Sequence, residues 1–388
     1  MFLRKDIMKN QVLKNKRICI VHVGDFIKYP PVISLVENLL HNEYSVDLVS
    51  CTKSDSVPEH FVVNSKFNYH FVTLNTSRGL FNKIKRNFIE RKKLISTVET
   101  CMKNDDFLWT TTDVTVKILG KILYKYNHIM QLMELSQRYP GFINIKFFDF
   151  PIQEYAKKAY KVVVPDVDRA YIQQAWWELS DVPIVLPNKP YSLNSEKIDF
   201  KQNEAIEKIK NEKRKVILYT GIITPERNIA DFAKSISNRD DYCLYIIGSS
   251  PIKNYIDTLL AENKNIEYLG YYPAPSHLEF LKYAYVGLTP YVPTKSKLHP
   301  VLNALYCAPN KIFEYAAYGV PMIGTDVLGL KRPFEQHSIG VTCKTIDSKN
   351  VSEALEIIDN NYKKMVNNCH KFYDSINLDE IVKSIIEQ

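Results

Sequence analysis

The stretch "VILYTGIITPERNIADFAKSI", residues 216–236, decides the fold class because a buried strand in it is followed directly by an amphipathic helix. The β-branched apolar run ends at Gly221, and a helix is predicted from about Pro225. Four apolar residues of that helix share one face: Ile229, Phe232, Ala233 and Ile236. A strand that leads into a helix is the repeating unit of a parallel sheet, because parallel strands need a crossover between them.

The same alternation runs along the rest of the chain. Strands are predicted in "RICIVHVG", "YSVDLVSC", "YHFVTL", "DFLWTTT", "FINIKFFDF", "KVVVP" and "VPIVLPN", and later in "CLYIIG", "IEYLG" and "VPMIGTD". Helical spacing lies between them, for example at residues 113–126 and 151–159. We therefore predict an α/β protein.

The length of 388 residues favours two domains. A polar stretch after residue 187 interrupts the strand signals and marks the junction. We place one Rossmann-like parallel-sheet domain at residues 1–189, joined by a C-terminal helix at 370–388, and a second at 190–369. Parallel sheets bind ligands beyond the carboxyl ends of their strands, so we expect the two domains to face a central cleft that holds the chemistry.

Composition limits the class of protein. The chain is 45% hydrophobic and 24% charged, and no apolar run approaches the roughly 18 residues that a membrane span needs. Residues 1–17 lack the apolar core of an export signal, and seven cysteines stand without metal-binding spacing, so we expect a cytoplasmic protein with reduced thiols. A net charge of +8 suits an anionic partner. No nucleic-acid-binding motif is evident, and we expect no nucleic-acid partner.

A charged pair stands in the otherwise apolar stretch "APNKIFEYAAYGVPMIGTD", residues 308–326. Asn310 lies at a predicted helix entrance, whose free amides attract a phosphate, and Lys311 would reinforce that attraction. One turn further, Glu314 could accept hydrogen bonds from two neighbouring hydroxyls, as a ribose presents them. The alternative is a surface ion pair between Lys311 and Glu314, which contributes only a few tenths of a kcal/mol.

Arg227 is the second notable charge, because a cation in the first turn of a helix opposes the helix dipole. Its planar guanidinium can hold two phosphate oxygens, which favours a diphosphate ligand beside Gly221. The alternative is a solvated arginine at a loop exit.

These stretches, together with "YLGYYPAPSHLEFLKYAYVGLTPY", resemble the second domain of GT-B glycosyltransferases, especially the retaining family 4 group. The resemblance covers about residues 215–345. It implies a nucleotide-sugar donor, UDP- or GDP-linked, bound by the second domain with its diphosphate near Gly221 and Arg227 and its ribose near Glu314. It also implies an acceptor bound by the first domain and no metal or other cofactor.

The sequence departs from the family pattern at two positions. The family commonly has two glutamates separated by seven residues, and Tyr306 stands where the first would be. Ile222 follows Gly221 where many members carry a basic residue. These differences leave the sugar and the stereochemical outcome open.

For the transfer, Arg227 and Lys311 are the candidates to stabilise the charge that develops on the leaving diphosphate. Asp25, beside Gly24 after the first strand, could contact the acceptor or act as a base, although a turn-forming role is the alternative. Asp149 and Asp113 follow later strands and could contact the acceptor or cap helices. Two histidines, His22 and His299, are interpreted as structural or solvated.

A basic amphipathic helix is predicted at residues 80–95, within "RGLFNKIKRNFIERKKLI". Such a helix can lie on anionic lipid, which would place the protein on the inner face of the cytoplasmic membrane. The alternative is a helix that covers the first sheet and exposes a solvated basic side.

The favoured function is transfer of a sugar from a nucleotide-sugar donor to a hydroxyl of a glycan or lipid-linked acceptor, with retention of configuration. A role in bacterial surface polysaccharide or capsule synthesis follows only from the family's common use. The alternatives are a nucleotide-sugar epimerase or hydrolase of the same architecture, or a catalytically silent protein that binds sugar nucleotides.

Overall fold

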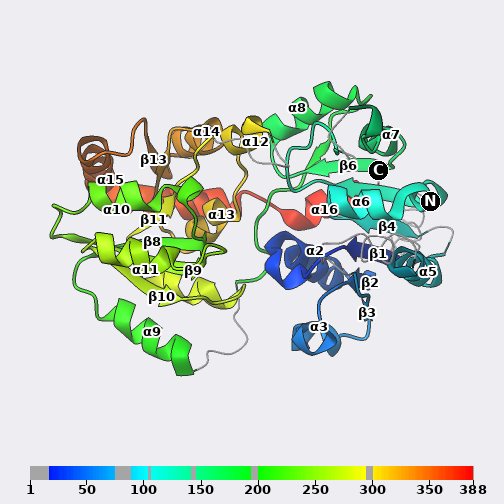
Figure 1. Cartoon of the computed structure of the whole chain (residues 1–388), viewed down its shortest axis with the longest axis horizontal. Coiled ribbons are helices and arrows are strands. Elements are labelled where there is room, and N and C mark those ends of the chain that lie inside the picture. Colours follow the sequence, from blue (N-terminus) through cyan, green and yellow to red (C-terminus); the bar gives the residue numbers. More distant parts are fainter. Residues whose placement is uncertain are drawn as a thin grey trace, which may run out of the picture. The chain divides into compact units, whose positions relative to one another are not determined.

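The computed structural model describes residues 17–74, 89–103, 106–140, 146–193, 200–293 and 300–387. The chain divides into two compact units (Figure 1). Unit 1 comprises residues 1–187 and 377–388, and unit 2 comprises residues 188–376. The sequence interpretation placed these boundaries at 189/190 and 369/370.

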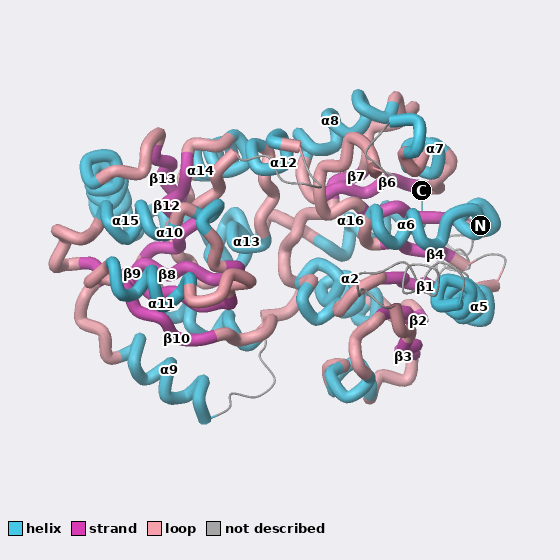
Figure 2. The backbone as a smooth tube through the Cα atoms, in the orientation of Figure 1, coloured by secondary structure: helices cyan, strands magenta, loops and turns pink. Residues whose placement is uncertain are grey.

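Unit 1 contains a seven-stranded sheet in the order β3-β2-β1-β4-β5-β6-β7, with parallel pairing throughout. Its strands are β1 (Arg17–His22), β2 (Ser45–Ser50), β3 (Phe67–Phe71), β4 (Phe107–Thr110), β5 (Asn127–Gln131), β6 (Lys161–Val164) and β7 (Ile184–Val185). Figure 2 shows these strands in magenta among the helices of the unit. Successive residues of β1 alternate between the two faces of the sheet and all are buried except Arg17, as expected when helices cover both faces.

One face of this sheet packs against α5 (Arg91–Cys101), α6 (Asp113–Leu119), α7 (Ile152–Lys157) and α8 (Val167–Trp177). Two further helices, α2 (Pro30–His41) and α3 (Glu59–Val62), pack against β2 and β3. Short 3-10 turns complete the described part: η1 (Phe26–Lys28), η2 (Ser54–Ser56), η4 (Gly120–Lys125) and η5 (Lys146–Phe148).

Residues 146–150 do not form the predicted strand, whose residues 142–145 lie outside the described part, and β5, which was not predicted, lies between β4 and β6. Polar residues in β5 conceal it: His128 and Gln131 are buried and hydrogen-bonded within the sheet. The His128 ring lies 2.8 Å from Thr110 Oγ1, and the indole of Trp109 donates to Gln131 at 2.9 Å. Residues 146–148 of the predicted strand form the turn η5.

The C-terminal helix α16 (Leu378–Glu387) packs on α2 and so belongs to unit 1. The Asp379 carboxylate accepts hydrogen bonds from the amides of Asn38 at 2.7 Å and Asn42 at 2.6 Å. The return to unit 1 begins at residue 377 rather than 370 because helix α15 continues without a break from Ser348 to Asp374.

Unit 2 contains a six-stranded parallel sheet in the order β10-β9-β8-β11-β12-β13. Its strands are β8 (Lys215–Ile222), β9 (Tyr242–Ser249), β10 (Ile266–Gly270), β11 (Val286–Thr289), β12 (Met322–Thr325) and β13 (Gly340–Cys343). Its helices are α9 (Phe200–Lys210), α10 (Ile229–Ser235), α11 (Tyr255–Glu262), α12 (Val301–Leu305), α13 (Asn310–Ala317), α14 (Leu328–His337), α15 and the 3-10 helix η7 (Ser276–Tyr283).

Both faces of this second sheet carry an apolar core. One core contains residues of α13, α14 and the end of α15, and the other contains residues of α10, α11 and the beginning of α15. The predicted class, two Rossmann-like parallel-sheet units, is therefore confirmed. None of the helices among the described residues combines the length and the apolar composition that a bilayer crossing requires.

Candidate functional site

The carboxyl end of β8 is the starting point of the site. Gly221 there has a φ of +129°, a backbone conformation that favours glycine. The ammonium of Lys311 lies 2.9 Å from the point where a Cβ of residue 221 would stand. Because glycine has no side chain, the Lys311 ammonium can approach the backbone at the end of β8.

Helix α13 presents Lys311 and Glu314, and its position against the sheet is set by Tyr315. The Tyr315 hydroxyl donates to the carbonyl of Leu218 at 2.8 Å, and the ring lies where a Cβ of Gly287 would stand, at 2.5 Å. Strand β11 therefore needs glycine at residue 287 for the helix to approach this closely.

Tyr291, which follows β11, brings two cations together. Its backbone is held by Thr325, whose hydroxyl oxygen accepts from the Tyr291 N–H at 2.9 Å. The guanidinium carbon of Arg227 lies 4.4 Å from the Tyr291 ring centre, and the Lys311 ammonium lies 5.9 Å from the same centre. Lys311 also lies 5.4 Å from the ring centre of Tyr219. All three distances are in the cation–π range.

The electrostatic setting of Lys311 is unusual for a lysine. Burial and then the nearby positive charge of Arg227 lower the pKa of Lys311 to about 8, against an opposing effect of Glu314. Two cations held this close favour a negative ligand, because an anion would relieve their mutual repulsion.

Glu314 is 5% exposed, and its carboxylate lies 3.5 Å from the imidazole of His277 in η7. Burial raises the pKa of Glu314, but the charge and hydrogen bond of His277, with the charge of Lys311, outweigh burial and leave the pKa below its usual value. The carboxylate is therefore ionised at neutral pH. The surface ion pair considered for Lys311 and Glu314 is wrong, since Glu314 is buried and its partner is His277.

Arg227 lies in a different local structure from the one predicted. Residues Pro225–Arg227 form a 3-10 turn, and α10 begins only at Ile229 because Asn228 has a left-handed φ of +50°. Arg227 thus precedes the helix rather than lying in its first turn. Its charge is therefore not in the position at which it would oppose the helix dipole.

Three other positions singled out in the sequence belong to the same unit. Asn310 is the first residue of α13 and is partly buried. Tyr306 follows α12, and Ile222, the last residue of β8, is 58% exposed.

The candidates in unit 1 have local partners. Asp25 accepts a hydrogen bond from the Thr52 hydroxyl at 2.8 Å and lies 3.5 Å from the ammonium of Lys28. The backbone carbonyl of Gly24 accepts from the N–H of Cys51 at 3.0 Å. These contacts fix the turn at the end of β1.

Asp149 and Asp113 are likewise engaged. Arg138 donates to both carboxylate oxygens of Asp149, at 2.6 and 2.8 Å. Asp113 accepts from the Ser136 hydroxyl at 3.1 Å in the first turn of α6. His22 is buried, with Nδ1 2.8 Å from Thr111, and burial lowers its pKa to about 4. His299 lies outside the described residues.

The described residues of unit 2 thus place a glycine at a strand end, two cations and a buried carboxylate in one region. Cations and free amides suit an anion, and a buried carboxylate suits paired hydroxyl donors. Sequence reasoning identified Gly221, Arg227, Lys311 and Glu314 but missed His277 and Tyr291. Both lie in the stretch at residues 268–291, where no local spacing connects them to α13.

Comparison with known proteins agrees with this picture. Residues 214–360 match the family model for glycosyl transferases group 1. A search of the curated proteins found no match. Similar solved structures include HepE of Anabaena in complex with UDP-glucose, at 11% identity and a TM-score of 0.68, with 96% of this chain and 98% of that chain covered.

Two further structures are similar over the same extent. Sucrose-phosphate synthase of Thermosynechococcus elongatus has 13% identity and a TM-score of 0.67, covering 96% of this chain and 97% of that chain. A glycosyltransferase of Rickettsia africae has 13% identity and a TM-score of 0.64, covering 96% and 99%. Residues 214–360 are therefore similar to glycosyl transferases group 1, and the solved structures show that the chain has the fold of GT-B glycosyltransferases.

Proposed function

We propose that unit 2 binds the nucleotide-sugar donor and that the protein transfers the sugar to a hydroxyl of the acceptor. The observation that carries this proposal is the meeting of Arg227 and Lys311 over Tyr291, beside Gly221. The diphosphate would lie against these cations and the N-terminal amides of α13 at Asn310. The similar structure of HepE, which holds UDP-glucose, supports a nucleotide sugar as the ligand.

Glu314 is assigned to the ribose in this proposal. An ionised carboxylate can accept hydrogen bonds from both ribose hydroxyls, and burial strengthens those bonds because water does not compete. His277 keeps Glu314 ionised and oriented, so it acts as a positioning residue.

The chemical step follows from the same charges. As the bond between the sugar and the diphosphate breaks, negative charge accumulates on the leaving diphosphate. Arg227 and Lys311 would face that position, so the barrier would be lowered without reorganisation of solvent. No metal is needed for this charge stabilisation, and retention of the sugar configuration is part of the proposal.

The acceptor is assigned to unit 1, with Gly24, Asp25 and Asp149 as the proposed contact residues. A glycan or lipid-linked acceptor, used in bacterial surface polysaccharide or capsule synthesis, is the proposed substrate class. Asp149 would have to exchange its contacts with Arg138 to take part.

The proposed location is the cytoplasm, with binding to the inner face of the membrane through the basic segment 80–95. Residues 75–88 lie outside the described part. In the rest of the segment, Leu94 is buried in the core of unit 1, whereas Lys92 and Lys93 are exposed. Sedimentation with anionic and neutral liposomes tests this location, and equal binding to both, or none, rules it out.

Donor and acceptor screening tests the reaction. UDP- and GDP-sugars are mixed with glycan and lipid-linked acceptors, and the products are separated by mass spectrometry. A glycosidic product supports transfer, an altered free sugar nucleotide indicates an epimerase, free sugar indicates a hydrolase, and binding without turnover indicates a silent protein.

Two variants test the site. Arg227→Ala and Glu314→Ala are each expected to abolish most turnover while the far-ultraviolet circular dichroism is unchanged. Arg239→Ala and Glu356→Gln serve as matched controls, because Arg239 pairs with Asp241 before β9 and Glu356 is exposed on α15. Near-normal donor affinity and rate in both site variants would refute the assignment.

A further inference from the structure

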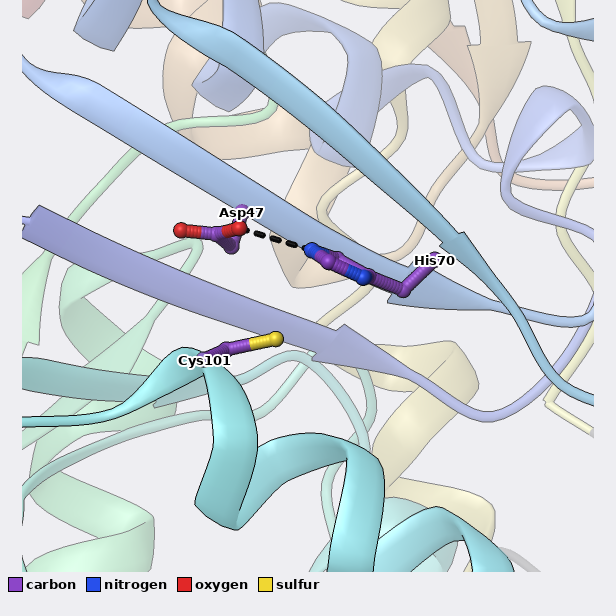
Figure 3. Close-up of side chains that lie close together, drawn as sticks. All are labelled: Asp47, His70 and Cys101. Carbon is purple, nitrogen blue, oxygen red and sulfur yellow. Dashed lines mark hydrogen bonds and ion pairs between the residues drawn. The ribbon is translucent and has the colours of Figure 1, made fainter.

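A cluster of metal-ligating side chains lies in unit 1, apart from the residues discussed so far. Asp47 of β2, His70 of β3 and Cys101 at the end of α5 point toward one another (Figure 3). Each offers one ligand atom, and these atoms lie within 4.8 Å of one another. Asp47 and His70 are in contact, with the imidazole Nε2 2.7 Å from the carboxylate Oδ1.

A fourth donor adjoins this cluster. Cys19 of β1 is paired in register with Asp47, so the two side chains leave the same face of the sheet. Cys101, at the end of α5, lies in the same apolar core as Cys19. Cys19 is fully buried, and Asp47 and Cys101 are 2% and 6% exposed. Cys19 therefore stands beside the group of Asp47, His70 and Cys101 and can supply the fourth donor.

The surroundings of the cluster fit a bound dication. Arg17 contacts Oδ2 of Asp47 at 2.6 Å, which leaves Oδ1 to act as a single-oxygen ligand. Two thiolates, one carboxylate and a neutral imidazole carry three negative charges, which a dication and the Arg17 guanidinium balance. Residues that hydrogen-bond a metal ligand and orient it in this way are common around protein metal sites.

We propose that Asp47, His70, Cys101 and Cys19 form a structural Zn²⁺ site. Zinc takes four ligands in a tetrahedron and prefers sulfur and imidazole nitrogen, with carboxylate oxygen as a frequent addition. Both thiols lose their protons to solvent when the metal binds, and the hydrogen bonds within the cluster are replaced by bonds to zinc. The ion would tie the end of α5 to the edge of the sheet formed by β1, β2 and β3.

This site is independent of the proposed glycosyl transfer, because its ligands belong to unit 1 and none is assigned to donor or acceptor. A closed site with four protein ligands leaves no position for substrate, which is the arrangement of structural rather than catalytic zinc. The proposal therefore concerns stability, and it survives if the donor assignment fails.

Cobalt substitution tests the site on the full-length protein. The protein is stripped with a chelator, kept reduced with a phosphine, and titrated with Co²⁺. We expect one Co²⁺ per chain, with the visible absorption of tetrahedral cobalt and a thiolate-to-cobalt charge-transfer band. Added Zn²⁺ should displace the cobalt and raise the melting temperature of the chain.

The variants are Cys101→Ser and His70→Asn, with Cys51→Ser as the matched control. Cys51 is partly exposed and follows β2, but it is not among the ligands. We expect the first two variants to remain folded by circular dichroism and to bind Co²⁺ at least about tenfold more weakly, whereas Cys51→Ser is unchanged.

Other outcomes overturn the proposal. Absence of the charge-transfer band in reduced wild-type protein would mean that the cluster is a hydrogen-bonded group without metal. A band that persists in Cys101→Ser, or that is lost equally in Cys51→Ser, would place the metal elsewhere.

Discussion

At the scale of single residues, the charge state of Lys311 links the site to pH. Its ammonium lies between Arg227, Glu314 and two tyrosine rings. The pKa of about 8 means that the side chain changes its charge within an experimentally accessible range. A surface lysine would not respond there.

Donor affinity is expected to depend on this titration. Below pH 8 Lys311 is charged and attracts the diphosphate, whereas above pH 8 binding must take up a proton. The dissociation constant should therefore rise by up to about tenfold per pH unit above that value. Calorimetric titration with the donor between neutral and alkaline pH measures it. Lys311→Met should bind more weakly, and its affinity should lack this alkaline dependence.

The titration of Lys311 also affects the stability of the fold. Donor affinity should fall as the pH rises, whereas stability should increase. Between pH 8 and 10.5 the unfolded chain holds a proton on Lys311 that the folded chain has lost. The free energy of unfolding contributed by this group should therefore increase with pH across that window. Denaturant unfolding of wild type and Lys311→Met, compared at matched pH values, reveals it. An identical pH dependence in both proteins would contradict the assignment.

His277 is expected to control the acidic side of the profile. Without it, both the charge and the hydrogen bond of His277 are lost, and the pKa of Glu314 should rise. In His277→Ala the loss of donor affinity on acidification should therefore begin at a higher pH than in wild type. His337→Ala, at the exposed end of α14, is the control and should leave the profile unchanged. A purely structural role would lower stability without moving the profile.

At the scale of elements, the close approach of α13 to β11 positions Lys311 and Glu314. In Gly287→Ala the new Cβ would stand 2.5 Å from the ring of Tyr315, which must move and carry α13 with it. Overpacking of this kind costs about 1–3 kcal/mol, and donor affinity should fall at the same time. Denaturant unfolding and calorimetry of the variant measure both effects.

A double-mutant cycle separates this clash from other effects of the substitution. Tyr315→Leu removes the ring, so Gly287→Ala should cost much less in that background than in wild type. Equal costs in both backgrounds would mean that the ring is not the obstacle.

At the scale of the whole molecule, the chain crosses from unit 2 back to unit 1 before its last helix. Asp379 binds the amides of Asn38 and Asn42, and the Asn38 side chain is 1% exposed. Asp379→Ala leaves a buried amide without this partner, at a cost of about 1–3 kcal/mol. We expect unit 1 to unfold at a lower temperature in this variant.

Calorimetry with and without the nucleotide assigns the transitions to the two units. The donor should raise the unfolding temperature of unit 2, and Asp379→Ala should leave that shift unchanged. Glu380→Ala is the matched control, because Glu380 is exposed in the same first turn of α16. If Glu380→Ala destabilises the protein as much as Asp379→Ala, the hydrogen bonds to α2 are not the cause.

The sequence alone determined the class of fold and part of the candidate site. Strand and helix periods are local properties, so the alternation of the two units was readable from residues such as those at 216–236. Arg227, Lys311 and Glu314 were also recognisable as charges in or beside apolar segments, and Gly221 as the end of a predicted strand. The strand β5 was missed because its buried polar residues find partners only in neighbouring strands.

The tertiary structure decided which residues meet. His277 and Glu314 come from η7 and α13, Arg227 and Lys311 come from the turn after β8 and from α13, and packing on the sheet brings each pair together. No regular spacing in the sequence marks Asp47, His70 and Cys101 as a cluster, because two strands and a helix contribute to it. The period of a segment determines which face is buried, but only contacts between distant segments determine what that face touches.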